Sequence, residues 1–188
     1  MMRRQPGKEN AMEQNILTVD GKNYRLLRLL GHGKGGYSYL CADGAGEYVL
    51  KQLHHEPCSY YQFGDKFEAE LRDYERLCAA HIPMPKMLGA DRATERILKE
   101  YIPGPTVFEL VGRGEMREEY LAQMRAMLPE LYAAGLNIDY YPTNFVVHDE
   151  RLFYVDYECN AYMEQWDFDH WGVKYWSKTP EYLAAAKQ

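Results

Sequence analysis

The sequence lacks any long apolar stretch. No segment of its 188 residues approaches the roughly eighteen consecutive apolar residues that a membrane-spanning helix needs. No apolar segment follows the charged N-terminus either, which argues against a secretory signal peptide, and we expect residues 1–14 to form a disordered leader. Positive charge is also in deficit, with 22 Lys and Arg against 28 Asp and Glu and a net charge of −6. We therefore do not expect nucleic acid as the main partner, because its phosphate backbone is bound by a basic face.

Cysteine is scarce as well, and no C-x-x-C motif occurs. The four cysteines are Cys41, Cys58, Cys78 and Cys159. This number and spacing are typical of free, mostly buried thiols in a reducing compartment, so we expect a cytoplasmic protein. His54, His55 and Cys58 lie close together in the sequence, but no second pair of ligands with zinc-binding spacing follows them, which favours an ordinary loop.

The first half of the chain has the pattern of an antiparallel sheet and one helix. Strand-forming runs lie at 24–30, 37–42, 47–53, 87–88 and 96–101. The turn sequence at 43–46 joins two of these runs into a predicted hairpin. Apolar residues at helical spacing from Phe67 to Cys78 predict an amphipathic helix, which the prolines at 83 and 85 end.

The second half has a helical pattern with one hairpin. The Pro-Gly-Pro sequence at 103–105 interrupts the chain, and apolar residues then repeat at helical spacing over 116–134. Pro129 lies inside that segment, where a proline costs roughly 3 kcal/mol, so we expect a kink or an early boundary there. The runs at 145–148 and 152–155 predict a hairpin, and the last eight residues a short helix. Together the two halves predict an α+β fold.

Three glycines, Gly31, Gly33 and Gly36, occupy the connection between the first two predicted strands. A phosphate can approach the backbone closely where no Cβ intervenes, and it then accepts hydrogen bonds from N–H groups. The alternative is a flexible hairpin tip, since glycine is a common residue. The loop joins a strand to a strand, which excludes the dinucleotide-binding motif, because that loop opens a helix.

Lys51 lies on the third predicted strand, on one face with apolar neighbours. A lysine in such a place needs an anionic partner, because burial of a lone ammonium group is costly. Glu70, at the centre of the predicted helix, is the favoured partner, with Glu68 and Glu75 as competitors. The pair would direct Lys51 at the α- and β-phosphates of a nucleotide, and the alternative is a solvated lysine on an edge strand.

Two further segments complete the candidate nucleotide site. In the connector at 99–102, the carbonyl of Glu100 would accept from an adenine amine and the N–H of Ile102 would donate to the ring. Asp139 and Asn144 lie five apart on a proline-constrained loop, and Asp156 follows a strand. Asp139 would orient an acceptor hydroxyl and take its proton, while the other two would bind magnesium, which favours oxygen ligands. The alternative is ordinary turn residues.

These motifs, in this order, resemble those of the protein-kinase-like superfamily. The segment Glu100-Tyr-Ile-Pro-Gly-Pro-Thr is similar to the hinge of small atypical kinases, including the RIO-type and tRNA-complex kinases and the aminoglycoside phosphotransferases. Asp139-Tyr-Tyr-Pro-Thr-Asn-Phe-Val-Val resembles the catalytic loop of those proteins and of the bacterial lipopolysaccharide heptose kinases. The chain thus resembles a minimal bacterial member, and the similarity covers about residues 24–158.

The resemblance implies a two-lobe fold, with a nucleotide-binding sheet and helix at 15–102 and a truncated helical lobe at 103–188. It implies ATP and Mg²⁺ as cofactors and these roles: nucleotide-binding Gly31, Gly33, Gly36, Glu100 and Ile102, phosphate-binding Lys51 paired to Glu70, catalytic Asp139, and metal ligands Asn144 and Asp156. The expected activity is transfer of a γ-phosphate to a serine or threonine of a protein acceptor that the sequence does not identify. A small-molecule or sugar kinase is an alternative.

Several positions depart from the usual kinase pattern. Asn137-Ile138 stands in place of His-Arg before the catalytic aspartate, Tyr141 in place of a lysine, and Glu158 in place of the glycine of Asp-Phe-Gly. A pseudokinase that binds nucleotide or a partner without chemistry is therefore a third hypothesis. The tryptophans of the tail are Trp166, Trp171 and Trp176. We expect them to pack under the catalytic loop, with a substrate-facing aromatic rim as the alternative.

Overall fold

The computed structural model describes residues 15–56 and 64–187. The leader expected at 1–14 and Cys58 lie outside these ranges. Among the described helices, none has the length and apolar character that crossing a membrane requires.

Two compact units make up the chain. The first comprises Met1–Phe67 and Lys86–Tyr101, and the second comprises Glu68–Pro85 and Ile102–Gln188. The chain therefore passes from one unit to the other after Phe67, after Pro85 and after Tyr101. Helix α2 (Lys66–Ala79) begins in the first unit and continues in the second.

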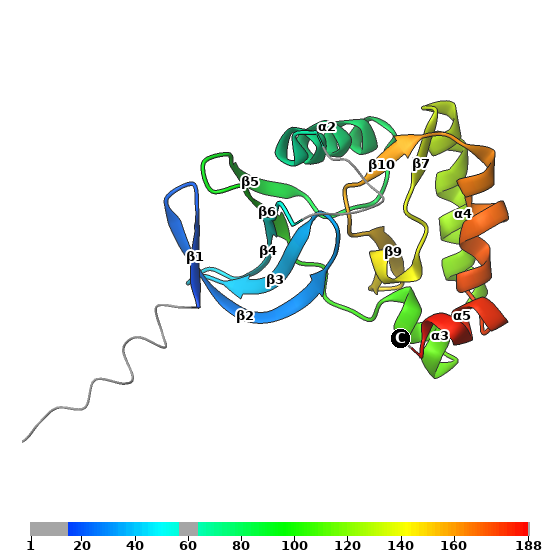
Figure 1. Ribbon diagram of the computed structural model, residues 1–188. Coiled ribbons are helices and arrows are strands. Elements are labelled where there is room, and N and C mark those ends of the chain that lie inside the picture. Colours follow the sequence, from blue (N-terminus) through cyan, green and yellow to red (C-terminus); the bar gives the residue numbers. More distant parts are fainter. Residues whose placement is uncertain (1–14, 57–63, 188) are drawn as a thin grey trace, which may run out of the picture. The chain divides into compact units, whose positions relative to one another are not determined.

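The first unit is built on a six-stranded antiparallel sheet. Its strands are β1 (Ile16–Val19), β2 (Lys22–His32), β3 (Gly36–Ala42), β4 (Glu47–Leu53), β5 (Met87–Asp91) and β6 (Arg96–Glu100). They lie in the order β1-β2-β3-β4-β6-β5, and Figure 1 shows β2 and β3 curving strongly along their length. The strands predicted at 24–30, 37–42, 47–53, 87–88 and 96–101 are all present, so the antiparallel sheet is confirmed.

Strand β1 is the one strand of this sheet that the sequence analysis did not predict. A two-residue turn joins it to β2, with Val19 opposite Lys22 in the ladder. The turn residues, Asp20 and Gly21, have positive φ values of 48° and 76°. An Asp-Gly pair with two positive φ angles is the usual type I′ hairpin turn, whose twist matches that of the flanking strands.

One face of this sheet carries a small apolar core. Its buried members are Val19, Tyr24, Cys41, Leu50 and Leu98. Burial is the main reason that the pKa of the Cys41 thiol rises to about 11, so this cysteine stays protonated at neutral pH. Cys159, in the second unit, is also buried, and its pKa is raised to about 12 chiefly by the same cause. The prediction of buried thiols holds for these two cysteines.

The buried face of helix α2 includes Phe67 and Leu77, as the apolar pattern predicts, but it does not include Cys78. Leu77 is fully buried in the core of the second unit, whereas Cys78, predicted on the buried face, is exposed. The buried stripe instead passes through Asp73, one turn before Leu77. Asp73 is tolerated there because its Oδ1 lies 3.3 Å from Nη1 of Arg76 on the same helix. A charged residue can therefore occupy an inward position that periodicity assigns to an apolar one.

The second unit combines helices with two small two-stranded sheets. Its elements after α2 are α3 (Val107–Arg113), α4 (Glu118–Ala133), β7 (Leu136–Ile138), η1 (Pro142–Asn144), β8 (Phe145–His148), β9 (Arg151–Tyr154), β10 (Cys159–Ala161), the short helices η2 (Glu164–Trp166), η3 (Phe168–Gly172) and η4 (Val173–Tyr175), and α5 (Pro180–Ala185). Strand β7 pairs with β10, and β8 pairs with β9. The hairpin predicted at 145–155 is confirmed.

Helix α4 continues through its proline. Of the two alternatives expected at Pro129, a kink or an early boundary, the early boundary is wrong, because the helix extends to Ala133 and the N–H of Ala134 still donates to Glu130 at 3.1 Å. Met124 and Leu131 are fully buried in the core of this unit. Their burial offsets the loss of one helical hydrogen bond, since each buried side chain of this size contributes about 1.5–3 kcal/mol.

Helix α3 follows the predicted break and was itself not predicted. Thr106 caps its N-terminus: its hydroxyl accepts from the N–H of Glu109, whose carboxylate in turn accepts from the N–H of Thr106. Gly114 ends the helix in the left-handed region, with φ of 73°. The capping box and the terminal glycine were both readable in the sequence, but seven residues are too few to show a helical period.

Candidate functional site

The three glycines lie at the hairpin between β2 and β3. Gly33 and Gly36 close the hairpin, with N–H to carbonyl distances of 3.1 and 3.3 Å in the two directions. Of the three, only position 36 requires a glycine for steric reasons, because a Cβ on Gly36 would lie 2.4 Å from the backbone oxygen of Gln52 on β4. A Cβ on Gly31 or Gly33 would meet no described atom within 4 Å. Packing therefore explains one of the three glycines, and the open space beside the other two is what a phosphate contact requires.

Lys51 is buried on a central strand. It lies on β4 between Ser38 of β3 and Ile97 of β6, and only 7 % of its surface is exposed. The solvated edge lysine considered above is therefore excluded. Lys99 on β6 is a second buried lysine, 3 % exposed, and it lies opposite Val49. Register places Lys51 and Lys99 on the same face as diagonal neighbours, about 7–8 Å apart at Cα. Two buried lysines therefore share this face of the sheet, and the sequence analysis did not identify Lys99 as one of them.

The predicted connector begins at the end of β6. The N–H of Glu100 donates to Lys86 at 2.9 Å, and the N–H of Lys86 is 3.2 Å from a carboxylate oxygen of Glu100. These two contacts fix the end of the strand. The chain passes to the second unit between Tyr101 and Ile102, and Ile102 is buried.

In the second unit, a hairpin brings together the two predicted metal ligands. Asn144 directly precedes β8, and Asp156 is the second residue after the end of β9. Phe145 pairs with Tyr154, and the N–H of Val155 donates to the carbonyl of Asn144 at 2.9 Å. Asn144 and Asp156 are therefore neighbours across the open end of the hairpin, although they are far apart in the sequence.

The loop that carries Asp139 is tied to the same hairpin end. The side-chain amide of Asn144 donates to the carbonyl of Asp139 at 3.3 Å. The N–H of Tyr141 donates to Oδ1 of Asp139 at 3.1 Å and fixes the direction of that carboxylate. Asp156 is held in a similar way, because its Oδ1 accepts from the N–H of Tyr157 at 2.8 Å. The structure thus places Asp139 and Asn144 in direct contact.

The hydroxyl of Tyr154 links the two aspartate segments. This side chain is fully buried, and its hydroxyl donates to the carbonyl of Glu158 at 2.8 Å while the N–H of Asp139 lies 3.4 Å from it. The pKa of Tyr154 is raised well above 10, first by burial and then by the negative charges of Asp156 and Asp139. Both carboxylates are therefore close to this hydroxyl, which stays protonated and can donate. The sequence analysis did not assign Tyr154 a role.

Glu70 belongs to the same neighbourhood of the second unit. The pKa of Tyr157 is raised by burial above all, and the negative charges of Glu70 and Asp156 add to the effect. Tyr157 packs on Tyr74 of α2 with ring centroids 4.8 Å apart. Glu70 and Asp156 therefore both lie within electrostatic range of the hydroxyl of Tyr157. Lys51, its predicted partner, belongs to the first unit, so the ion pair between them stays a prediction.

Aromatic side chains support the loop from within the core. The indole N–H of Trp176 donates to the carbonyl of Tyr140 at 2.8 Å, and both side chains are buried. Gly172 lies so close that a Cβ on it would be 2.6 Å from that of Tyr140. The expected packing of the tail under the loop is confirmed for Trp176, whereas half of the surface of Trp166 is exposed.

Two residues that depart from the kinase pattern, Tyr141 and Ile138, pack against other side chains. Tyr141 lies between Phe108 and Tyr175, with ring centroids 6.0 and 5.2 Å away. Ile138 is buried on β7 opposite Cys159. At these two positions, where kinases usually have cations, this protein therefore has buried or half-buried side chains that carry no charge.

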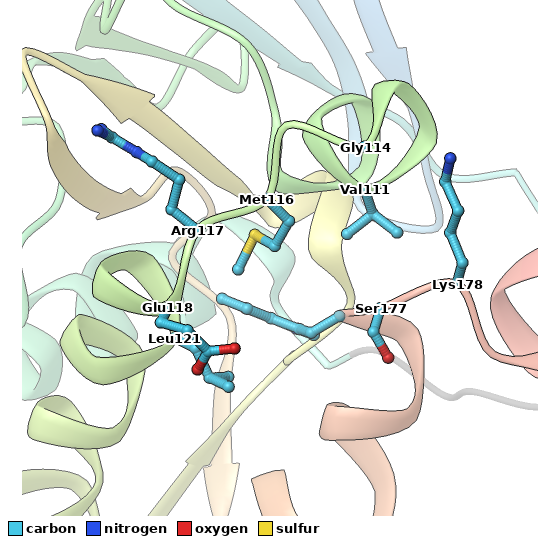
Figure 2. Close-up of a pocket in the computed structure, with 9 residues that line it drawn as sticks. Val111, Gly114, Met116, Arg117, Glu118, Leu121, Ser177 and Lys178 are labelled. Carbon is cyan, nitrogen blue, oxygen red and sulfur yellow. The ribbon is translucent and has the colours of Figure 1, made fainter.

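A separate pocket of about 270 Å³ lies elsewhere in the second unit. Figure 2 shows its lining, which comes from the end of α3, the start of α4 and the segment before α5. The charged lining residues are Arg117, Glu118 and Lys178. Its lining includes neither Asp139 nor Asn144 nor Asp156, although Trp176, which supports their loop, forms part of its wall.

The antiparallel sheet, the helix α2 and the loop with its adjoining hairpin together define the protein-kinase-like fold, and solved structures agree. The chain is similar to two structures of the PknI kinase domain of Mycobacterium tuberculosis. One is of a point mutant, with 22 % sequence identity and a TM-score of 0.52, and the other has 23 % identity and a TM-score of 0.51. At this level of identity the similarity establishes the fold.

The aligned region covers 75 % of this chain in both cases, and 60 % and 59 % of the two kinase domains. The chain thus spans about three fifths of the length of these structures. No protein-family model matches the sequence, and a search of curated proteins also finds no match.

Proposed function

We propose that the protein is an ATP- and Mg²⁺-dependent phosphotransferase that transfers the γ-phosphate to a serine or threonine hydroxyl of a protein. The observation that carries the proposal is that the carboxylates of Asp139 and Asp156 both lie near the hydroxyl of Tyr154, while Asn144 contacts the carbonyl of Asp139, in a protein with a kinase-like fold. The sequence pattern alone had already selected the two aspartates and the asparagine as candidates.

The residues present fit a magnesium ion. Asp156 and Asn144 offer carboxylate and amide oxygens, which are the hard donors that Mg²⁺ prefers beside phosphate oxygens. The ion would neutralise charge on the phosphates when bound. Asp139 would orient the acceptor hydroxyl and accept its proton, with its carboxylate direction set by the N–H of Tyr141.

The residues that the sequence predicts to bind nucleotide would hold it through its phosphates and its base. Lys51 would contact the α- and β-phosphates, with Glu70 as its partner, while the backbone of Gly31, Gly33 and Gly36 would cover the phosphates. The carbonyl of Glu100 and the N–H of Ile102 would bind the adenine. Catalysis of this kind is mostly positioning, and correct orientation alone can supply about 7–11 kcal/mol.

Two other functions have a specific observation in their favour. Tyr141 contributes an aromatic ring where kinases usually contribute a cation, which favours a pseudokinase. Mg²⁺·ATP would then raise the melting temperature without any turnover. The resemblance of the segment from Glu100 to Thr106 to small atypical kinases favours a small-molecule or sugar kinase. That enzyme would turn over ATP with a metabolite panel and with no protein.

The test is an acceptor screen with γ-labelled ATP and Mg²⁺, which offers generic proteins and a panel of small hydroxyl compounds in parallel. Asp139→Asn should abolish transfer. The matched control is Asp149→Asn, an exposed aspartate at the turn of the same β8–β9 hairpin, where φ is 46° and asparagine is well tolerated. Equal transfer by the wild type and Asp139→Asn would defeat the assignment of Asp139.

A further inference from the structure

Three side chains with metal-binding chemistry meet beside the glycine hairpin. His32 ends β2, and His54 and Glu56 follow the end of β4. One ligand atom from each lies within 4.8 Å of the other two, and Nε2 of His32 is 3.7 Å from Oε2 of Glu56. Ligand atoms around one tetrahedral zinc are about 3.3 Å apart, so small side-chain movements would complete the geometry.

Tyr37 contacts two members of this cluster, His32 and Glu56, and orients their side chains. The ring of His32 stacks on Tyr37 with centroids 4.2 Å apart and planes 6° from parallel. The hydroxyl of Tyr37 donates to Oε1 of Glu56 at 2.7 Å and so orients this carboxylate. Protein groups that orient the ligands of a metal in this manner are a regular part of metal sites.

The tautomer of His54 follows from its two contacts. Its Nε2 lies 2.9 Å from the carbonyl of Gly33, which can only accept, so Nε2 carries the proton. The other ring nitrogen, Nδ1, then has the lone pair. It accepts a hydrogen bond from the N–H of Glu56 at 3.2 Å, which a bound cation would displace. A metal-binding histidine normally donates its second N–H to a backbone carbonyl or a carboxylate, and His54 already has that arrangement.

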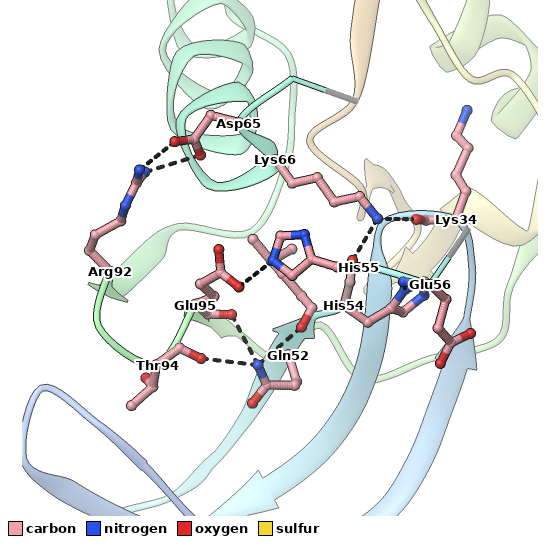
Figure 3. A network of polar contacts seen from close by, with 11 residues as sticks. Lys34, Gln52, His54, His55, Glu56, Asp65, Lys66, Arg92, Thr94 and Glu95 are labelled. Atoms are coloured by element: carbon pink, nitrogen blue, oxygen red, sulfur yellow. Dashed lines mark hydrogen bonds and ion pairs between the residues drawn. The ribbon is translucent and has the colours of Figure 1, made fainter. Parts of the chain in front are cut away.

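One cation lies close to the cluster. Nζ of Lys66 is 2.6 Å from the carbonyl of His54 and 2.9 Å from that of Lys34, as Figure 3 shows. These contacts direct the ammonium group toward backbone oxygens. They also link the start of α2 to both the glycine hairpin and the segment after β4, so the cluster is part of an ordered network.

We propose that His32, His54 and Glu56 form a binding site for a zinc-class divalent cation. Two imidazoles and one carboxylate are a common ligand set for zinc, with water in the fourth position, whereas Mg²⁺ and Ca²⁺ prefer oxygen ligands alone. Water has access, because the side chains of His32 and Glu56 are 47 % and 55 % exposed. The sequence analysis favoured an ordinary loop at His54. In this proposal the segment after β4 instead supplies two ligands, His54 and Glu56, and His32 at the end of β2 supplies the third.

Such an ion would have a structural consequence that does not depend on the proposed function. It would cross-link the end of β2 to the segment after β4, on either side of the hairpin that Gly33 and Gly36 close. The position of that hairpin would then depend on metal. Zn²⁺ should therefore raise the melting temperature, because a ligand that binds only the folded state stabilises it.

The test is isothermal titration of the untagged full chain with ZnCl₂, after removal of metal with a chelator. One ion should bind per chain, and His32→Ala, His54→Ala and Glu56→Gln should each abolish or greatly weaken binding. Tyr37→Phe keeps the ring that stacks on His32 but loses the bond to Glu56, and it should weaken binding by about tenfold.

Two variants serve as matched controls: His55→Ala, at the neighbouring histidine that pairs with Glu95, and His148→Ala, in the other unit. Both should bind zinc like the wild type. Titration with Co²⁺ adds a spectroscopic signature, since a site of nitrogen and oxygen ligands gives visible ligand-field bands without a thiolate charge-transfer band.

Three results would overturn the proposal: no stoichiometric binding by the wild type, unchanged binding by all three ligand variants, or binding that Cys58→Ser removes and His32→Ala does not. Melting temperatures without metal, measured for every variant, separate a lost ligand from a lost fold.

Discussion

Tyr154 provides the sharpest test of how the site is held together. Tyr154→Phe removes one buried hydroxyl that donates to Glu158 at 2.8 Å and lies 3.4 Å from the N–H of Asp139. The second contact is the weaker of the two, because 3.4 Å is longer than a usual N–H to oxygen hydrogen bond. The loss of the donor to this partly buried carbonyl should lower the free energy of unfolding by about 1–3 kcal/mol.

The effect on activity should exceed what this loss of stability explains. Tyr154 is a positioning residue, because its hydroxyl joins the segment of Asp139 to the segment that follows Asp156. A displacement of about 1 Å in such a site can lower the rate about a hundredfold. We expect kcat to fall by about tenfold to a hundredfold, while KM for ATP changes little, because Tyr154 itself does not contact the substrate.

Tyr182→Phe is the matched control for this experiment. The hydroxyl of Tyr182 donates to the carbonyl of Phe108 at 2.9 Å, and its side chain is also buried, but it joins α5 to α3. Urea unfolding should show similar losses of stability in the two variants, and steady-state kinetics should show a fall in kcat for Tyr154→Phe alone. Equal activity of the two variants would refute the positioning role.

Two further predictions follow from the glycine hairpin and from the C-terminal segment. Gly36→Ala should destabilise the fold by about 1–3 kcal/mol in urea unfolding, because its Cβ would meet the backbone of Gln52, whereas Gly33→Ala should leave stability unchanged and weaken ATP binding in a titration. The pKa of His170 is raised above 6.5 by its hydrogen bond to Asp167, so its stabilising effect is complete below pH 6.5 and is lost as pH rises through the raised pKa. His170→Gln should remove that part of the pH dependence of unfolding, and an unchanged pH profile would contradict the pairing.

Much of the sheet could be predicted because its strands are long enough to show a period. Strands β2, β3 and β4 each have seven or more residues and adjoin at least one glycine-containing turn. Strand β1 has four residues and was missed, although the Asp20-Gly21 pair after it is a strong hairpin signal. Short elements are found through the turns and caps that bound them, because they have too few residues for periodicity.

Some polar residues of the site could be predicted because their side-chain groups and their place on loops are enough to suggest a role. Asp139, Asn144 and Asp156 stand out as carboxylate and amide groups on loops beside strands, and the hairpin brings them together. Tyr154 and Lys99 do not stand out, because tyrosine and lysine are ordinary residues in strands. Their significance comes from burial and register, which depend on strand pairing between distant segments.

The cluster of His32, His54 and Glu56 also could not be predicted from the sequence, because it too depends on strand pairing. His54 was noticed, but its sequence neighbours His55 and Cys58 were the residues considered with it. His32, the other histidine of the cluster, is brought close to His54 by the pairing of β2 with β3 and of β3 with β4. Sequence spacing identifies a metal site only when the ligands are local, and here they are not.

The most direct test of the proposed site is the binding of Mn²⁺, used as a paramagnetic substitute for Mg²⁺, in the presence of ATP. Electron paramagnetic resonance should show nucleotide-dependent Mn²⁺ binding to the wild type and to Asp149→Asn. That binding should be lost or strongly weakened in Asp156→Asn and in Asn144→Leu. Undiminished Mn²⁺ binding by both of these variants would contradict the claim that Asn144 and Asp156 hold the ion that accompanies ATP.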